Sequence, residues 1–368
     1  MKILLVTHSQ FGLLVDYHRY YTYLKSKGHE VKYLCYDFNK ERIEPGNPDI
    51  IYVPRKKNKV FNHLRFIRAV AACNKEHDFD RVMIHVFPLV SLLLLWLDRG
   101  KAYLDIRTVS IHKKKYKRAF FDFLILIAST LYKHVSVIAD SAAKQIGIRK
   151  YKLLPLGGAY FGDDPISRED QERFGPIVQT DDYVFLYVGA LRRRNIIECV
   201  RGFHQYLQKN PGSAVRFIVV GSSPGNELEE INQYIQKHQL QAFVYTTGFI
   251  PQNRLAIFFK HANCGVSFTP MVMPYPLQPN TKTYEYLVNG MPFIANPSLD
   301  NVRIMDSAPM PVGVIVEDSA AGMEEAFGTI LRSKELYKKE EIRKEYSRYE
   351  WDNLFKIYLE QALSLNGQ

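Results

Sequence analysis

The segment Thr281–Pro292, TKTYEYLVNGMP, decides how the second half of the chain folds. Asn280 or Thr281 can cap the start of a short helix, because a side-chain oxygen at that position accepts an unpaired backbone N–H. Gly290 can end the helix, since glycine readily adopts the left-handed conformation that follows many helices. The apolar run Phe293–Ala295 comes directly afterwards and predicts a buried strand. The segment is therefore predicted to be a short helix that leads into a sheet.

One carboxylate, Glu285, lies a turn inside this helix, on the same face as Thr281. A helix N-terminus offers unpaired N–H groups and the positive end of the helix dipole, both of which suit a diphosphate. A carboxylate one turn further along can accept both hydroxyls of a ribose. This arrangement predicts a nucleotide pocket. The alternative interpretation is an ordinary helix-to-strand turn with an exposed glutamate, and the helix alone does not decide between the two.

The spacing Glu285-x4-Gly-x-Pro, followed by an apolar strand, resembles the donor-site signature of GT-B glycosyltransferases, particularly the group 1 enzymes (family 4). The resemblance implies that Glu285 is the second carboxylate of an E-x7-E motif and binds the ribose. Leu277 stands where the family has its first glutamate, which approaches the donor sugar, so this chain departs from the motif there. Gln278, Asn280 and Lys282 can supply polar contacts in its place.

Two further segments extend the resemblance. VGALRRR, Val188–Arg194, resembles the strand and loop that open the family's second domain, where an Arg and a Lys hold the diphosphate. Those two family positions fall on Ala190 and Asn195, so the implied phosphate ligands are instead drawn from Arg192, Arg193 and Arg194, with backbone contact at Gly189. A guanidinium is suited to bidentate phosphate contact, and we expect Arg193 and Arg194 to act on the departing diphosphate. The alternative is a solvated basic turn. LPLGG, 154–158, resembles the segment that precedes the family's domain linker.

Three glycine-containing turns complete the implied binding site. Gly221 begins a turn similar to the family's G-x-G-P turn, although many strand-to-helix turns require such a glycine. Phe249 and Ile250 follow a strand in a turn similar to G-x-V/I-P, whose backbone contacts the nucleotide base. Gly12, after the first strand, matches the glycine loop that faces donor and acceptor in many GT-B enzymes.

Asp105 and His112 are the candidate acid–base groups of the first half, because Asp105 stands at the end of an apolar strand and His112 follows that strand. The alternative is structural: Asp105 pairs with Arg107 or caps a helix, and His112 faces solvent. The chain shows no Ser-His-Asp spacing, no cluster of metal ligands and no P-loop. We therefore expect no metal and no cofactor other than the nucleotide-sugar co-substrate.

The chain alternates apolar runs with helical segments, which predicts parallel sheets covered by helices on both faces. The expected strands are 2–7, 30–36, 81–86, 101–106, 134–139, 151–155, 183–188, 214–220, 243–246, 264–267, 293–295 and 312–316, and the expected helices of the first half are 14–27, 59–75, 89–98, 114–133 and 141–147. The expected fold class is α/β, of the GT-B type, with two Rossmann-like domains facing a cleft. We expect the first domain at 1–160, a linker at 161–180, the donor domain at 181–345, and a helix at 346–368 whose stripe Trp351, Leu354 and Tyr358 packs back on the first domain.

Charge and composition limit the classes of partner that the protein is expected to bind. The chain of 368 residues is 46% hydrophobic and carries a net charge of +11. Its basic cluster, Lys113, Lys114, Lys115, Lys117 and Arg118, directly precedes the apolar-aromatic segment 119–131, a pattern typical of a helix that lies on an anionic membrane surface. The alternative is a solvated helix start. No motif of a nucleic-acid-binding protein is present, and no signal peptide precedes the first strand. We expect a cytoplasmic protein that is peripheral on the inner face of the membrane.

These observations favour a metal-independent, retaining glycosyltransferase that moves a sugar from a nucleotide-diphosphate sugar, UDP being favoured over GDP. Its acceptor is expected to be a glycan or lipid-linked glycan in surface polysaccharide assembly. One alternative is a non-catalytic sugar-nucleotide-binding or scaffold protein, which Leu277 favours and Glu285 disfavours. The other is a nucleotide-sugar epimerase of the same architecture, for which the required set of carboxylates and histidines is not identified.

Overall fold

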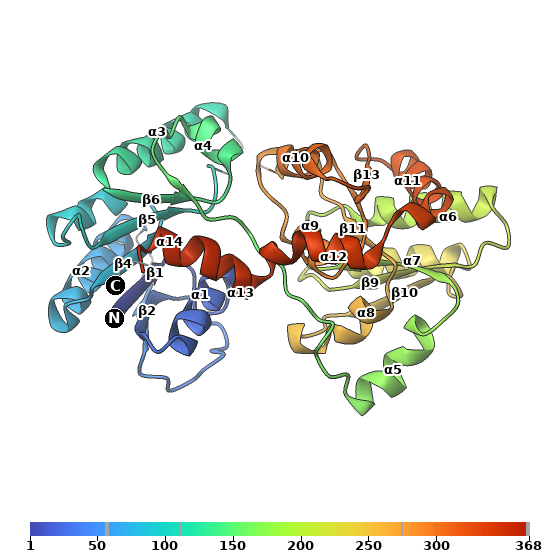
Figure 1. The fold of residues 1–368 in the computed structure, drawn as a ribbon, viewed down its shortest axis with the longest axis horizontal. Coiled ribbons are helices and arrows are strands. Elements are labelled where there is room, and N and C mark those ends of the chain that lie inside the picture. Colours follow the sequence, from blue (N-terminus) through green and yellow to red (C-terminus); the bar gives the residue numbers. More distant parts are fainter. Residues whose placement is uncertain (56–58, 111, 113, 274, 366–368) are drawn as a thin grey trace. The chain divides into compact units, whose positions relative to one another are not determined.

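A computed structural model describes residues 1–55, 59–110, 112, 114–273 and 275–365. The chain divides into two compact units (Figure 1). Unit 1 holds residues 1–156 together with the segment from Trp351 onward, and unit 2 holds residues 157–350.

Unit 1 is built on a sheet of seven parallel strands in the order β3-β2-β1-β4-β5-β6-β7. Apolar side chains fill the central strands, and Ile3, Leu4, Leu5 and Val6 of β1 are fully buried, as expected for a parallel sheet covered on both faces. The strands are β1 (Lys2–Thr7), β2 (Glu30–Asp37), β3 (Ile50–Pro54), β4 (Arg81–His85), β5 (Ala102–Ile106), β6 (His134–Val137) and β7 (Lys152–Leu153).

The helices of unit 1 are α1 (Val15–Ser26), α2 (Lys59–His77), the 3-10 helix η1 (Val90–Leu95), α3 (Lys115–Leu131) and α4 (Asp140–Ile146). Two elements differ from the sequence prediction. The edge strand β3 was not predicted, and the expected helix at 89–98 is a short 3-10 helix. Leu89 has a left-handed backbone with φ +66°, which prevents a regular α-helix from starting there.

The C-terminal segment packs against unit 1 as α13 (Trp351–Leu354), the π-helical turn η6 (Phe355–Leu359) and α14 (Glu360–Ala362). The ring of Phe355 contacts Tyr20 and Tyr23, and the Tyr23 hydroxyl donates a 2.6 Å hydrogen bond to Glu360. The predicted stripe was partly wrong: Trp351 and Leu354 are buried, but Leu359 is buried in preference to Tyr358. A π-turn holds one residue more than an α-turn, so the buried face moves along by one position.

Unit 2 is built on six parallel strands in the order β10-β9-β8-β11-β12-β13, around an apolar core. Its strands are β8 (Tyr183–Val188), β9 (Val215–Val220), β10 (Val244–Gly248), β11 (Cys264–Ser267), β12 (Phe293–Ala295) and β13 (Gly313–Ile315). Its helices are α5 (Arg168–Val178), α6 (Ile196–Lys209), α7 (Glu227–Lys237), η2 (Gln252–Arg254), α8 (Ala256–His261), η3 (Tyr275–Leu277), α9 (Thr281–Val288), α10 (Leu299–Ser307), α11 (Ala320–Arg332), η4 (Lys334–Leu336), α12 (Lys339–Tyr346) and η5 (Ser347–Tyr349). Two parallel α/β sheets confirm the predicted fold class.

The segment 161–180, expected to be a linker, contains helix α5 of unit 2. Ser167 caps this helix by accepting a hydrogen bond from the Asp170 N–H, and Arg254 donates to the Asp170 carboxylate at 2.9 Å. Phe174 packs on Phe258 of α8. The linker was predicted from the glycine and proline residues near this segment. The N-cap hydrogen bond of Ser167 and the apolar contact of Phe174 stabilise a helix there instead.

Candidate functional site

Helix α9 begins and ends as its sequence predicts. The Asn280 side chain accepts a hydrogen bond from the Lys282 N–H and caps the helix. At the other end, the Gly290 N–H bonds to the Leu287 carbonyl and the Met291 N–H to the Tyr286 carbonyl, each at 2.9 Å. With Gly290 at φ +75°, this is a Schellman termination. The chain then enters β12 at Phe293, so the short helix is attached directly to the sheet.

The inner face of α9 is held by buried hydrogen bonds. The Thr283 and Ser267 hydroxyls lie 2.8 Å apart, the Tyr284 hydroxyl donates to Asp300 at 2.8 Å, and the Tyr286 hydroxyl donates to the Val266 carbonyl. These side chains are buried, whereas Thr281, Lys282 and Glu285 keep part of their surface exposed. The three predicted ligands therefore lie on the accessible face of a rigidly held helix.

The segment that follows β7 packs on the same helix. A Cβ on Gly158 would lie 2.8 Å from the backbone nitrogen of Glu285, so only glycine allows this close approach. The Asn289 side chain donates to the Ala159 carbonyl at 2.8 Å and accepts from the Phe161 N–H at 2.9 Å. The segment 158–161 of unit 2 thus packs against the backbone of α9 at Glu285.

The loops after β8, β9 and β10 meet at one edge of the sheet. Gly189 and Gly221 have φ values of +146° and +152°, which L side chains rarely adopt. A Cβ on Gly221 would lie 1.9 Å from the Gly189 carbonyl oxygen, and the Gly221 N–H donates to the Gly248 carbonyl at 2.9 Å. The glycines are needed for this close contact between backbones. Beyond Gly248, the Phe249 side chain is 72% exposed, while Ile250 is buried.

Lys282 extends from α9 to the loop after β8. A Cβ on Gly189 would lie 2.5 Å from the Lys282 Cε, and the Lys282 ammonium lies 5.4 Å from the centre of the Tyr187 ring. Burial and, to a smaller extent, the neighbouring Arg194 lower the pKa of Lys282 to about 8, against the opposing effect of Glu285. A cation with a lowered pKa, at the end of a strand and in the first turn of a helix, is suited to bind an anion.

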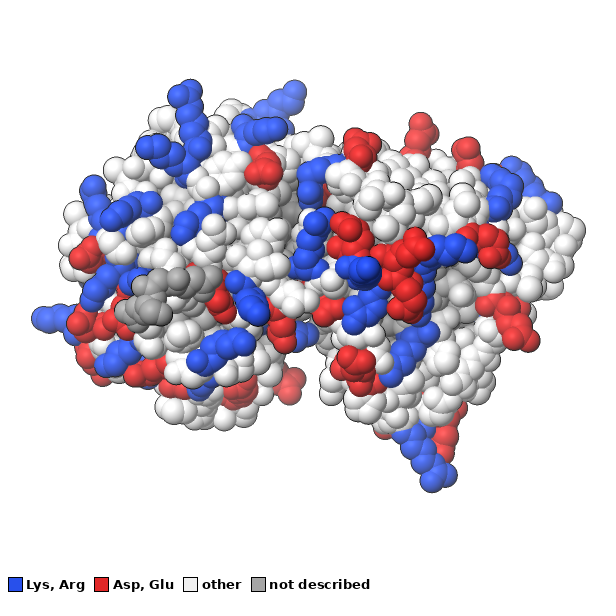
Figure 2. Space-filling model, in the orientation of Figure 1, with Lys and Arg blue, Asp and Glu red and all other residues white. Residues whose placement is uncertain are grey.

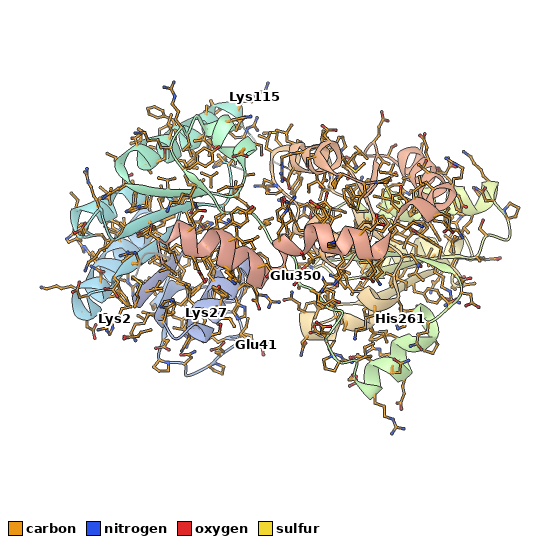
Figure 3. The ribbon with its side chains drawn as sticks, in the orientation of Figure 1. Lys2, Lys27, Glu41, Lys115, His261 and Glu350 are labelled. Carbon is orange, nitrogen blue, oxygen red and sulfur yellow. The ribbon has the colours of Figure 1, made fainter. Side chains whose placement is uncertain are left out.

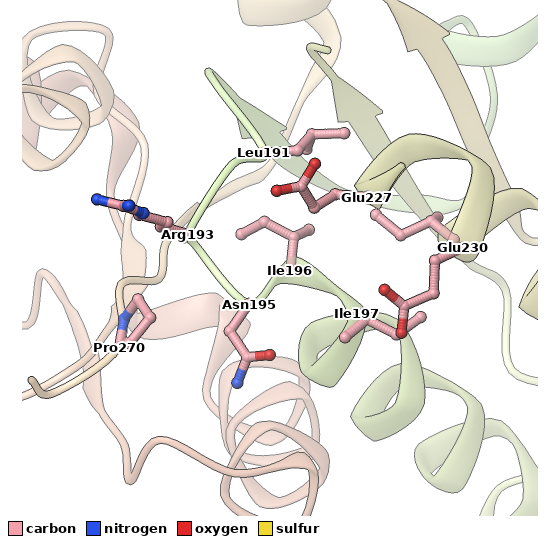
Figure 4. A pocket seen from close by; sticks show the side chains of 9 residues that line it. Leu191, Arg193, Asn195, Ile196, Ile197, Glu227, Glu230 and Pro270 are labelled. Atoms are coloured by element: carbon pink, nitrogen blue, oxygen red, sulfur yellow. The ribbon is translucent and has the colours of Figure 1, made fainter. Parts of the chain in front are cut away.

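The arginines at 192–194 have different surroundings in the structure. Arg194 lies beside Lys282 and 4.7 Å from the centre of the Tyr275 ring. Arg193 has a left-handed backbone, φ +58°, and lines a pocket of about 290 Å³ together with Glu227 (Figure 4). The pKa of Glu227 is lowered chiefly by the Ser223 hydroxyl, with smaller contributions that include Arg192 and the Arg193 N–H. Arg194 is therefore the arginine that shares a site with Lys282 and α9.

The aromatic rings of this site were missed by the sequence analysis. In the sequence, Tyr187 cannot be distinguished from the other residues of a buried apolar strand. In the structure, its ring faces Lys282 and its hydroxyl donates to the Ala190 carbonyl at 2.6 Å. Tyr275 follows the proline-rich loop and carries no distinguishing pattern. Both rings hold a cation through its attraction to their faces.

In unit 1, Asp105 lies inside the protein, at the end of β5. Its side chain is fully buried, accepts a 2.7 Å hydrogen bond from Ser136, and lies 3.9 Å from Arg107, which also pairs with Asp16 at 2.6 Å. Burial raises the pKa of Asp105 to about 6, against the opposing effect of Arg107. These contacts favour the structural alternative for Asp105, and its catalytic role stays a prediction.

The other two predicted residues of unit 1 lie on its loops. Gly12 follows β1 with φ +85°, and a Cβ there would lie 2.0 Å from Ile43, which explains the glycine. His112 is exposed, and its ring stacks on Phe121 of α3 with centres 5.2 Å apart. Lys113, the first residue of the predicted basic cluster, lies outside the described residues.

Helix α3 presents an unusual surface. Its buried side chains are Ala128 and Ser129, whereas five large apolar residues on it are strongly exposed: Tyr116, Phe120, Phe123, Ile127 and Leu131. We call these five residues the α3 stripe, because their spacing of three to four places them along one side of the helix. Lys115 lies at the outer end of α3 (Figure 3), and Lys and Arg side chains gather over this part of unit 1 (Figure 2). Among the described residues, no helix is both long and apolar enough to cross a membrane.

Comparison with known proteins identifies unit 2. A family model described as "Glycosyl transferases group 1" matches residues 168–345, which is most of that unit. Residues 168–345 form a group 1 glycosyltransferase domain. No curated protein sequence matches the chain significantly. The group 1 resemblance expected from the Glu285 segment is thus confirmed for residues 168–345.

Solved structures confirm the GT-B fold across both units. A glycosyltransferase from Rickettsia africae is similar with a TM-score of 0.75 at 13% identity, covering 100% of this chain and 99% of that one. HepE from Anabaena in complex with UDP gives a TM-score of 0.71 at 13% identity, with coverage of 99% and 100%. A sucrose-phosphate synthase from Thermosynechococcus elongatus gives 0.69 at 16% identity, with coverage of 99% and 97%.

Proposed function

We propose that this glycosyltransferase takes its sugar from a nucleotide-diphosphate sugar, with UDP as the favoured nucleotide, and transfers it to a glycan or lipid-linked glycan of the cell surface. The observation that carries the donor assignment is the group formed by Lys282, Arg194 and Glu285 on and beside the first turns of α9. Binding of UDP by the structurally similar HepE supports the choice of base.

In this site, each predicted ligand has a separate task. Lys282 and Arg194 neutralise the diphosphate without a metal, together with the N–H groups at the start of α9. Glu285 accepts the ribose hydroxyls, and the backbone of the Phe249–Ile250 turn contacts the base. As the sugar–phosphate bond breaks, negative charge grows on the diphosphate, so the two cations stabilise the transition state more than the bound substrate. Retention of the anomeric configuration is part of the proposal.

Glu285 is the residue to test for ribose binding. Glu285→Ala should weaken UDP binding by about 1.5–3 kcal/mol, because two ribose hydroxyls lose a charged acceptor. Glu285→Gln keeps the shape and should recover part of the affinity. Calorimetry of folded variants measures the effect. Equal UDP affinity in parent and Glu285→Ala would overturn the ribose assignment.

We further propose that α3 docks on an anionic membrane surface, with the α3 stripe in the interfacial layer and Lys114, Lys115, Lys117 and Arg118 on the lipid headgroups. The first turn of α3 contains no acidic side chain that would oppose this contact. Aromatic residues alternating with lysines are the composition of helices that lie in such an interface.

Replacing Lys114, Lys115 and Lys117 with Gln should weaken binding to vesicles that contain anionic lipid, by about 1 kcal/mol per charge near the surface. Co-sedimentation at low salt measures this loss. A matched triple replacement of Lys334, Lys338 and Lys339 in unit 2, which removes the same charge elsewhere, should have little effect. If both triple variants bind vesicles equally, the α3 cluster is an ordinary solvated surface.

A further inference from the structure

Unit 1 contains a pocket of about 500 Å³ beside the basic cluster of α3. Its walls are the loop and 3-10 helix after β4, represented by Phe87 and Leu92, and the inner side of α3, represented by Leu124 and Ile125. Val109 lines it from the loop after β5. The volume lies within the range of pockets that hold small organic ligands, and these walls are apolar.

The polar lining of this pocket comes from the ends of the strands. His8 follows β1, and Thr108, Ser110 and His112 follow β5. The His8 and His85 rings share a contact of 3.1 Å between their Nδ1 atoms, which holds the His8 ring in place. The Ser110 N–H donates to Asp122 of α3 at 2.8 Å, so the polar loop is attached to the helix that forms the apolar wall. The pocket thus combines a polar group of residues with an apolar wall.

Positive charge lies next to the polar residues. The Arg118 guanidinium donates a 3.0 Å hydrogen bond to the His112 carbonyl, which connects the basic cluster to the rim of the pocket. Lys114, Lys115 and Lys117 precede Arg118 and are exposed. The acidic residue nearest in sequence, Asp122, is already bonded to Ser110. An amphiphile with a hydrocarbon chain and an anionic head complements this distribution of charge and apolar surface.

We propose that this pocket binds the hydrocarbon chain of a lipid-linked acceptor, with the phosphate of that lipid on Lys114, Lys115, Lys117 and Arg118. The proposal rests on the proposed function in that it names the acceptor class of the transfer reaction. The proposal also explains why α3 exposes the α3 stripe. A helix docked on the membrane brings the pocket to the surface in which such a lipid resides.

Farnesyl phosphate, kept below its aggregation concentration, is a suitable probe for calorimetric titration of the full chain. Two residues of α3 give matched variants. Leu124 lines the pocket, whereas Thr130 is exposed and lies outside both the pocket and the α3 stripe. Leu124→Glu places a carboxylate against the hydrocarbon chain and should raise the Kd at least about tenfold, since a charge buried in apolar surroundings is unfavourable. Thr130→Glu adds the same charge to the same helix and should change the Kd less than about twofold.

Ser91→Trp is a second variant that fills the pocket without adding charge, and it should also abolish saturable binding. Farnesol, which lacks the phosphate, should bind more weakly than farnesyl phosphate, and added salt should reduce that difference. Failure of the parent to bind farnesyl phosphate saturably, or equal effects of Leu124→Glu and Thr130→Glu, would overturn the proposal. UDP titration of the same samples separates the two proposals. If the parent binds UDP but not farnesyl phosphate, the lipid acceptor alone is rejected. If the parent does not bind UDP, the proposed donor is rejected.

Discussion

Arg194→Ala should lower kcat by about 10²-fold, the effect of removing one preorganised donor from a developing negative charge. Arg193→Ala should leave kcat within a few-fold of the parent. The difference follows from position, since Arg194 lies beside Lys282, whereas Arg193 lines the separate pocket with Glu227. Steady-state kinetics with a UDP-sugar and its acceptor measures both variants, which carry the same loss of charge at two consecutive positions.

Arg194→Lys refines this test. Lysine keeps the charge but lacks the planar fork of a guanidinium, so it should restore only part of the lost turnover. KM for the donor should change less than kcat in Arg194→Ala, because the interaction strengthens as the sugar–phosphate bond breaks. Parental turnover in Arg194→Ala, or equal losses in the two alanine variants, would show that Arg194 is not the arginine on the diphosphate.

Lys282→Met should lower kcat/KM by about 10²–10³-fold and remove a pH dependence that the parent shows. The pKa of Lys282 is lowered to about 8 in the free protein, and a bound diphosphate must raise it, because opposite charges favour the protonated form. UDP affinity should therefore be constant below pH 8 and fall as the pH rises above 8, by at most about tenfold per pH unit. UDP binding above pH 8 should also take up a proton, which calorimetry in buffers of different ionisation enthalpy detects.

The same shift has the opposite sign for folding. An unfolded lysine keeps its proton up to a pKa of about 10.4, so between pH 8 and 10.4 the unfolded chain binds more protons than the folded one. This group therefore contributes increasing stability as the pH rises through that range, while UDP affinity falls. Lys282→Met should lose both trends. A parent whose UDP affinity is flat from pH 7 to 9.5 would contradict the assigned role of Lys282.

Much of the fold could be predicted from local pattern. Strands such as β8 and β11 are buried apolar runs, and burial on both faces of a parallel sheet makes such runs continuous. The ends of α9 were predicted because Asn280 and Gly290 act through local backbone geometry. Edge strand β3 was missed because it is less buried, and α5 was missed because its stability comes from tertiary contacts such as Phe174 with Phe258.

The candidate site was predictable only in part. Glu285 stands in a segment with a recognisable pattern, and the family match to residues 168–345 agrees with that pattern. The choice among Arg192, Arg193 and Arg194 depends on the left-handed turn at Arg193, which local sequence does not specify. The burial of Asp105 is likewise a result of packing, because a strand end and a buried ion pair look alike in sequence.

We propose that Lys282 and Glu285 of α9, with Arg194 of the loop after β8 beside them, bind the nucleotide diphosphate of the donor. Calorimetric titration of UDP into the parent and into Lys282→Met at pH 7 tests it most directly, with the unfolding temperature of each protein as the control for folding. The account predicts saturable binding to the parent and a Kd at least about tenfold higher for Lys282→Met, as expected when a charged hydrogen-bond donor is removed. Equal UDP affinity in the two folded proteins would contradict it.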